Sequence, residues 1–195
     1  MQNHWDDLLN IRTSGRDDTI ANQLNYPYEP TPYRVLERLA KSEYIGKKNV
    51  LLDYGCGKGR VDFYLSYETR CKVIGIDYDE RMIEVAMANK ERAYSGNRVE
   101  FVCANATSYE VPKEVDRCYF FNPFSIEILR GAVEKLMESY YENPRDMLLF
   151  FYYPSSEFVG FLNTSDEISF IDEISCEDLY GIRDERETIL IYKIG

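Results

Sequence analysis

The chain has 195 residues, of which 45% are hydrophobic and 29% are charged, and its formal net charge is −11. These values are ordinary for one globular domain and exclude disordered and fibrous classes of protein. No apolar run reaches the roughly 18 residues of a membrane-spanning helix, and the N-terminus lacks a basic segment followed by an apolar one, so we expect a cytoplasmic protein without a membrane partner. Because negative charge repels phosphate backbones, the composition disfavours a long nucleic acid as partner.

Residues 1–29 are interpreted as an N-terminal extension and a candidate lid. Residues 17–29 show little apolar periodicity, and prolines stiffen the stretch 26–30. We expect a mobile terminus and no catalytic role for His4, which is the only histidine. Residues 30–195 are assigned to the folded domain.

Five cysteines lie far apart along the chain and include no Cys-x-x-Cys pair. Together with the single histidine, this spacing disfavours a zinc site and a histidine-based catalytic triad, and no metal is assigned. We interpret the cysteines as free structural thiols.

The domain is predicted to begin with a helix from Pro30 to Leu39, with Thr31 as N-cap and Pro32 at the first helical position. From Asn49 onward, short apolar runs alternate with segments of helical period, which is typical of β-α-β units around a parallel sheet. The predicted strands span residues 49–54, 72–77, 99–103, 116–121, 147–153, 168–174 and 188–194. The predicted helices span 60–67, 80–94, 125–141 and 155–162, with an irregular crossover at 107–114. Because no helix separates the last two strands, we expect an antiparallel hairpin on an otherwise parallel sheet of the α/β class.

A glycine-rich turn follows the first predicted strand, in the sequence Asp53-Tyr-Gly-Cys-Gly-Lys-Gly59. Glycine permits left-handed turns and lets a ligand approach the backbone closely. The third glycine comes one residue earlier than in the Gly-x-Gly-x-x-Gly loop of nicotinamide-binding proteins, and Asp53 would turn negative charge toward a ligand. The pattern favours a ligand other than a dinucleotide, with a plain tight turn as the alternative.

This loop resembles motif I of the class I S-adenosylmethionine-dependent methyltransferases, and the predicted strands with their terminal hairpin are similar to the arrangement of that family. The resemblance extends from Asn49 to Gly195. It implies one domain with a Rossmann-like three-layer sandwich and a seven-stranded sheet, S-adenosyl-L-methionine as cofactor and S-adenosyl-L-homocysteine as product. In the family the loop lies under the methionine part of the cofactor, and the acid helps to hold its amino group. The residues assigned to this part of the cofactor site are Asp53, Tyr54, Gly55, Cys56, Gly57 and Gly59.

The second predicted strand ends in Asp77, 24 residues after Asp53. An acid about 20 residues after the loop can reach a ribose across a β-α-β unit, and a carboxylate suits two hydroxyl donors. The resemblance implies that Asp77 binds the ribose, with Tyr78 in the same site. Asp79 has the better spacing to cap the following helix, which leaves Asp77 for the ligand.

Asn105 and Ala106 follow the third predicted strand. The family commonly has an acid or amide here that bonds the adenine amino group, so the resemblance assigns Asn105 to the adenine, with the backbone N–H of Ala106 beside it. A turn-forming asparagine is the alternative.

The fourth predicted strand ends in Asn122-Pro123-Phe124, which partly resembles the Asn/Asp-Pro-Pro-Tyr/Phe motif of amino methyltransferases. In that motif a side-chain oxygen and a backbone carbonyl hold the N–H groups of the acceptor, and the aromatic ring stacks on it. Here the second proline is missing and Phe124 comes one place early. The resemblance implies a catalytic site at Asn122, Pro123 and Phe124. The alternative is that Asn122 and Pro123 only end the strand, and that Ser125 caps the next helix.

The sequence therefore predicts an S-adenosylmethionine-dependent methyltransferase acting on a small molecule or a protein side chain, with nitrogen as a candidate acceptor atom. Aromatic residues before the first strand and after the fifth are candidates to line the acceptor pocket, with packing on the sheet edge as the alternative: Tyr26, Tyr28, Tyr33, Tyr152 and Tyr153. Three other functions stay open, namely a non-catalytic S-adenosylmethionine-binding module, an RNA methyltransferase and a nicotinamide oxidoreductase. No general base and no oligomeric state is assigned.

Overall fold

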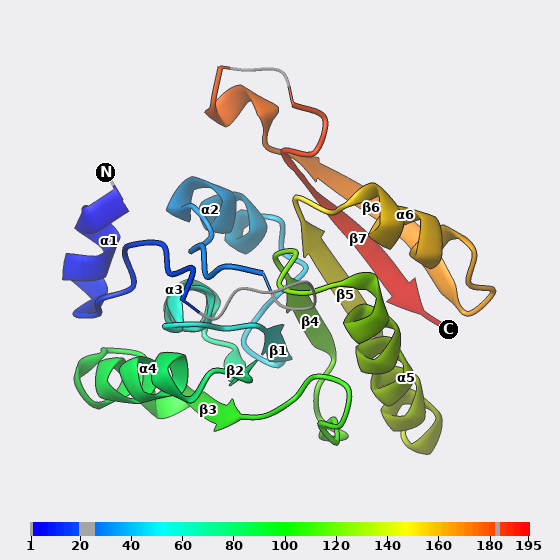
Figure 1. Cartoon of the computed structure of the whole chain (residues 1–195), viewed down its shortest axis with the longest axis horizontal. Helices are drawn as coiled ribbons and strands as arrows, with labels where there is room; N and C mark the ends of the chain where they lie inside the picture. Colours follow the sequence, from blue (N-terminus) through cyan, green and yellow to red (C-terminus); the bar gives the residue numbers. More distant parts are fainter. Residues whose placement is uncertain (1, 20–25, 182–183) are drawn as a thin grey trace.

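Seven strands form one continuous sheet in a computed structural model that describes residues 2–19, 26–181 and 184–195 (Figure 1). The strands are β1 (Val50–Tyr54), β2 (Lys72–Asp77), β3 (Val99–Cys103), β4 (Arg117–Phe120), β5 (Met147–Tyr152), β6 (Ile168–Ser175) and β7 (Thr188–Ile194). Their spatial order is β3-β2-β1-β4-β5-β7-β6. The first five are mutually parallel, and β7 runs antiparallel to both β5 and β6. The predicted mostly parallel sheet and its antiparallel hairpin are confirmed.

Helices cover both faces of the sheet and complete the predicted three layers. The helices are α1 (Gln2–Leu9), α2 (Tyr33–Lys41), α3 (Arg60–Thr69), α4 (Glu80–Arg92), α5 (Ile126–Glu142) and α6 (Ser156–Asn163), with 3-10 turns η1 (Gly96–Arg98) and η2 (Glu177–Leu179). On one face, α1, α2 and α3 pack in an apolar cluster with sheet residues such as Phe150. On the other, α5 and α6 pack in a second cluster with residues such as Phe151. Neighbouring strand residues thus enter opposite cores, as the two-residue period of a strand requires.

Aromatic rings join three parallel strands inside the second cluster. Tyr54, Phe120 and Phe151 are register partners on β1, β4 and β5. Both successive ring pairs have centroids 4.6 Å apart and planes within 8° of parallel. This stack fixes β1 beside β4, where the order of crossovers reverses and the ends of the strands leave space for a ligand.

The starts of the helices test three of the predicted caps. Asp79 caps α4 as predicted, because its side chain accepts a hydrogen bond from the N–H of Arg81. Thr31 does not cap α2, which begins at Tyr33 after Pro32; its hydroxyl lies 3.2 Å from that of Tyr119 instead. Ser125 occupies the N-cap position of α5, but its side chain makes no capping hydrogen bond.

The expectation of a mobile terminus around His4 is wrong, because residues 2–9 form α1. The indole N–H of Trp5 donates to Glu37 at 3.0 Å, and its ring meets the Tyr64 ring edge-on at a centroid distance of 4.9 Å.

Four of the five cysteines are buried free thiols, and Cys103 is exposed. Within the described ranges, no helix is long and apolar enough to cross a membrane.

Candidate functional site

A cavity of about 320 Å³ lies at the carboxyl ends of β1, β2, β3 and β4. This volume is within the range of small-molecule sites, and the position is the one at which open α/β sheets bind ligands. Most of the residues predicted for the site line this cavity, namely Asp53, Tyr54, Gly55, Cys56, Asp77, Tyr78, Asn105, Ala106, Pro123 and Phe124. Gly57, Gly59 and Asn122 are not among its lining residues. The fold therefore brings segments from four strand ends into one site.

The glycine loop takes a conformation that suits glycine at each of its three glycines, all of which have positive φ. At Gly57, φ is 53°, and a Cβ would lie 2.2 Å from the ring of Tyr28. At Gly55, φ is 76°, and a Cβ would lie 2.6 Å from Cβ of Pro123. The loop thus packs between the N-terminal segment and the end of β4. Gly57 contacts Tyr28 of that segment, whereas Gly55 and Cys56 line the cavity.

The Asp77 carboxylate already accepts two backbone hydrogen bonds, which the sequence does not predict. Its two carboxylate oxygens accept hydrogen bonds from the backbone N–H groups of Gly57 and Asp79, each at 2.9 Å. Burial raises the pKa of the Asp77 carboxyl, and these two backbone donors lower it. A carboxylate oxygen has two lone pairs, so each oxygen retains acceptor capacity toward the cavity. The side chain holds the glycine loop and lines the cavity at once.

Asp53 presents a buried carboxyl to the same cavity. The residue is 2% exposed, and among the described residues its Oδ2 accepts no hydrogen bond from a nitrogen or hydroxyl donor. Burial raises the pKa of this carboxyl. Because Asp53 lines the cavity, its carboxylate can accept hydrogen bonds from N–H groups of a ligand. The amino group of S-adenosylmethionine carries such N–H groups.

Asn105 forms the turn that the alternative interpretation predicts. Its Oδ1 accepts hydrogen bonds from the N–H and the hydroxyl of Thr107, both at 3.0 Å. Both Asn105 and the buried Ala106 line the cavity. The turn fixes the residue at the cavity wall, and contact with adenine stays a prediction.

Asn122 has an unusual backbone at the end of β4. Its φ is 41°, in the left-handed region, and its Oδ1 is shielded from solvent without a hydrogen-bond partner among the described residues. The carbonyl of Pro123 accepts a hydrogen bond from the N–H of Tyr26 at 3.2 Å. Phe124 is 5% exposed and packs edge-on against Tyr54, so its ring belongs partly to the core. Strain and an unpartnered acceptor at one residue mark the strand end as a functional candidate.

The aromatic candidates for the acceptor pocket divide into two groups. Tyr26 and Tyr28 line the cavity. Tyr33 is buried in the first core, Tyr152 is buried with its hydroxyl donating to Glu187, and Tyr153 donates to Asp184, so these three are not among the lining residues.

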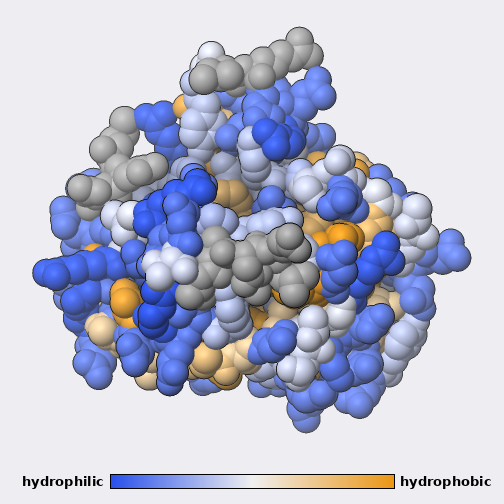
Figure 2. Space-filling view, in the orientation of Figure 1, coloured by the Kyte–Doolittle hydropathy of each residue, from blue (hydrophilic) through white to orange (hydrophobic). Residues whose placement is uncertain are grey.

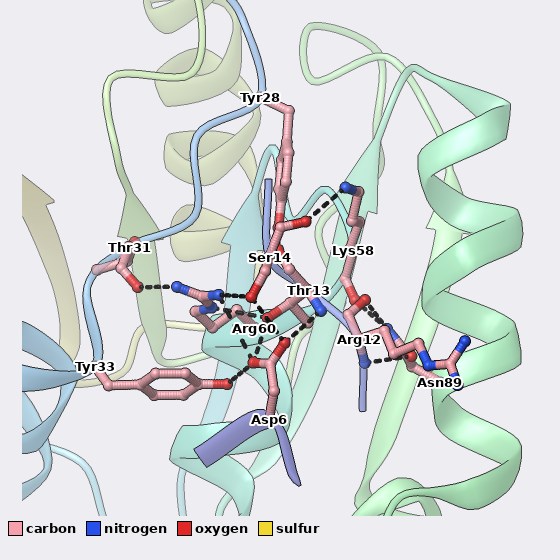
Figure 3. Close-up of polar contacts among 10 residues, drawn as sticks. All are labelled: Asp6, Arg12, Thr13, Ser14, Tyr28, Thr31, Tyr33, Lys58, Arg60 and Asn89. Carbon is pink, nitrogen blue, oxygen red and sulfur yellow. Dashed lines mark hydrogen bonds and ion pairs between the residues drawn. The ribbon is translucent and has the colours of Figure 1, made fainter. Parts of the chain in front are cut away.

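A buried polar network joins the N-terminal segment to the start of α3, directly after the glycine loop (Figure 3). Asp6 accepts hydrogen bonds from the backbone and hydroxyl of Thr13, at 2.7 and 2.8 Å, and from Tyr33 at 2.5 Å. Arg60 is 2% exposed, donates to the Thr13 hydroxyl at 2.8 Å and lies 3.7 Å from Asp6. Tyr28 completes the link by donating to the carbonyl of Thr13 at 2.7 Å.

The sequence analysis missed this network. The available signal was a charged residue, Arg60, at the head of a helix that is otherwise largely apolar in its first two turns. Its partners are up to 54 positions upstream (60 − 6) and no local pattern connects them. Ser14 and Tyr28 thus contact the glycine loop at Lys58 and Gly57, while residues 20–25 of the candidate lid lie outside the described residues.

Comparison with known proteins finds similarity to methyltransferases, in part of the sequence and in the fold. A family model described as a methyltransferase domain matches residues 51–143. A protein-lysine N-methyltransferase from Saccharolobus islandicus (strain REY15A) is 26% identical over 110 residues, which cover 56% of this chain and 68% of that protein.

Solved structures with similar folds include methyltransferases. An RNA methyltransferase from Salinibacter ruber, in complex with S-adenosyl-L-homocysteine, aligns with a TM-score of 0.60 at 17% identity over 85% of this chain and 94% of that one. A TehB-like S-adenosylmethionine-dependent methyltransferase from Corynebacterium glutamicum aligns with a TM-score of 0.58 at 16% identity over 82% and 86% of the two chains. Likeness at this identity shows the fold and leaves the acceptor to be argued from the site.

Proposed function

We propose that the chain is a class I S-adenosylmethionine-dependent methyltransferase that methylates the side-chain amine of lysine in a peptide or protein. The relative named as a protein-lysine N-methyltransferase supports this acceptor. The observation that carries the proposal is Asn122, which stands in the chain between the cavity-lining residues Phe121 and Pro123 and whose unpartnered Oδ1 can accept a hydrogen bond from an N–H group of an amine. A hydroxyl acceptor has only one hydrogen to offer and loses it in the reaction.

The acidic and aromatic residues that line the cavity agree with a cationic side chain as the acceptor. Asp17 and Glu29 line the cavity together with Tyr26 and Tyr28. Aromatic faces and nearby carboxylates both attract an ammonium group and its methylated products. Hydrophilic residues predominate on the face shown in Figure 2, with apolar residues in small separate areas. A net charge of −11 favours a basic peptide over RNA as the macromolecular partner.

The residues of the chain act mainly by positioning. Bound S-adenosylmethionine supplies an electrophilic methyl group. Asp53 would hold its amino group, Asp77 its ribose, and Asn105 with Ala106 its adenine. Asn122 would orient the amine so that its lone pair faces the methyl group once the ammonium proton has left. Orientation of two reactants can supply a large part of the rate acceleration.

The experiment is a transfer assay with radiolabelled S-adenosylmethionine and pairs of basic peptides that differ only in Lys→Arg substitutions. Small amines and an RNA of mixed sequence form parallel arms. We expect label in the lysine peptides alone, with the site located by mass spectrometry. Label in RNA or in the arginine peptides would contradict the proposal. Tight binding of S-adenosylhomocysteine without transfer in any arm would indicate a non-catalytic binding module.

A further inference from the structure

A second acid lies behind Asp53, and the function proposed above does not use it. Asp62 is fully buried in α3 and is not among the residues that line the cavity. Gly75 is the β2 register partner of Asp53, and a Cβ on Gly75 would lie 2.5 Å from Oδ1 of Asp62. Because side chains of parallel register partners leave the sheet on the same face, the Asp62 carboxyl occupies the space next to that of Asp53.

This arrangement is incompatible with two ionised carboxylates. Both oxygens of Asp62 and Oδ2 of Asp53 are shielded from solvent, and no nitrogen or hydroxyl donor of the described residues reaches them. The titratable groups that face the pair are Cys56 in the glycine loop, Cys71 before β2, Asp77 on β2 and Tyr119 on β4. None of these four groups is a cation, and the buried Arg60 of α3 lies 3.7 Å from another carboxylate, that of Asp6.

One shared proton resolves the conflict. Burial raises the pKa of Asp62 well above its ordinary value, and the charge of Asp53 and a hydrogen bond between the two carboxyls raise it further. Burial also raises the pKa of Asp53, but the same hydrogen bond lowers it. Both oxygens of Asp62 are shielded from solvent, whereas Asp53 lines the cavity, so Asp62 is the member of the pair that keeps the proton.

We propose that Asp62 is protonated at neutral pH in the folded protein and donates its O–H to Asp53, as a positioning residue that keeps the Asp53 carboxylate ionised and ready for the amino group of the cofactor. The inference rests on the cofactor and not on the identity of the acceptor. It assigns to Asp62 the role of a hydrogen-bond donor, which a carboxyl can fill only in its acid form.

The binding test uses two variants of similar size. In Asp62→Asn the amide still donates to Asp53, whereas Asp62→Leu removes the donor. At pH 7.5 we expect the calorimetric Kd for S-adenosylhomocysteine to stay within threefold in Asp62→Asn and to rise tenfold or more in Asp62→Leu. The loss in Asp62→Leu should shrink toward pH 9, because Asp53 then ionises without help. A merely structural role would produce no such pH profile.

The proton on Asp62 can also be observed directly, without cofactor. This measurement tests the proposal even if Asp62→Leu does not fold. Infrared difference spectra should show a carboxylic-acid carbonyl band at pH 8 in the unmodified protein and none in Asp62→Asn. The unfolded chain ionises Asp62 above its ordinary pKa, whereas the folded chain keeps the proton, so stability falls as pH rises through this window. Asp62→Asn escapes this loss, and its Tm advantage should grow from pH 5 to pH 8.

Asp172→Asn is the matched control, because its exposed carboxyl accepts from Tyr44 and has a lowered pKa, so its removal should bring no such advantage. Absence of the infrared band from the unmodified protein would overturn the proposal. So would an Asp62→Asn variant that binds S-adenosylhomocysteine as weakly as Asp62→Leu. Because no methyl acceptor enters these measurements, failure of the lysine proposal would leave them unaffected.

Discussion

Asn122 combines a left-handed backbone with a buried oxygen that has no partner. Each feature is unfavourable by itself. Their presence together at a strand end beside the cavity is therefore best explained by a functional role of Asn122. The sequence predicted the position from a partial motif, but neither the strain nor the unpartnered oxygen can be derived from residue types. Both depend on how the end of β4 meets the glycine loop and the N-terminal segment.

Removal of the Asn122 side chain should affect turnover far more than cofactor binding. We expect Asn122→Ala and Asn122→Gly to keep S-adenosylhomocysteine affinity within about twofold and to lower kcat by about 100-fold, equivalent to about 2.7 kcal/mol of transition-state stabilisation. Glycine accepts the positive φ without strain, so it separates loss of the amide from backbone effects. Full turnover in Asn122→Gly, measured by transfer of labelled methyl groups, would remove Asn122 from the acceptor site.

Asp77 is expected to control cofactor affinity. Asp77→Asn replaces one acceptor oxygen with a donor, which disturbs the ribose contact and one of the two backbone hydrogen bonds. We expect the calorimetric Kd for S-adenosylhomocysteine to rise tenfold or more, or about 1.4 kcal/mol. Asp178→Asn removes the same charge at a site outside the cavity lining and should leave the Kd unchanged. An unaltered Kd in folded Asp77→Asn would reject the ribose assignment.

At the scale of elements, the strands and the five helices from α2 to α6 were predictable because short apolar runs mark the strands and helix-like segments alternate with them. α1 was not, because its stability comes from contacts that are distant in sequence. The indole N–H of Trp5 donates to Glu37 across 32 positions, and Asp6 accepts a hydrogen bond from Tyr33 across 27. Thr31 failed as a predicted cap for the same reason, since its hydroxyl bonds Tyr119 on β4 instead of the helix.

The network around Arg60 should make the N-terminal segment a major contributor to stability. Asp6→Ala leaves the Arg60 guanidinium buried without its carboxylate. Breaking a buried pair costs about 3 kcal/mol, which corresponds to about 6–12 °C in Tm for a domain of this size. Asp7→Ala, which changes the exposed neighbour, should shift Tm by no more than about 1 °C. Equal Tm values for the two variants in calorimetric scans would show that the network contributes little.

At the scale of the whole molecule, the site is assembled from strand ends that only the sheet order brings together. The glycine loop and Asp77 were predictable because a family motif and a fixed spacing mark them. The buried pair of Asp53 and Asp62 was not, since the register that places Gly75 between them is a property of the sheet.

Cofactor binding should therefore stabilise the molecule as a unit. At 100 times the Kd, a ligand specific to the folded state adds about 2.7 kcal/mol, or about 5–10 °C in Tm. We expect shifts of this size with S-adenosylmethionine and S-adenosylhomocysteine and none with NAD, measured by differential scanning fluorimetry. Stabilisation by NAD alone would contradict the assignment of the cavity.

The position of β7 between β5 and β6 has a consequence for biosynthesis. During translation β6 emerges from the ribosome before β7, and β7 is its only neighbour in the sheet as far as the structure describes it. A nascent chain that ends before Thr188 therefore carries β6 with its hydrogen-bonding edges unpaired and β5 with one edge open, a state prone to association with other chains. Truncation before Thr188 should therefore give a chain that aggregates, whereas the intact sheet leaves β7 with no open edge.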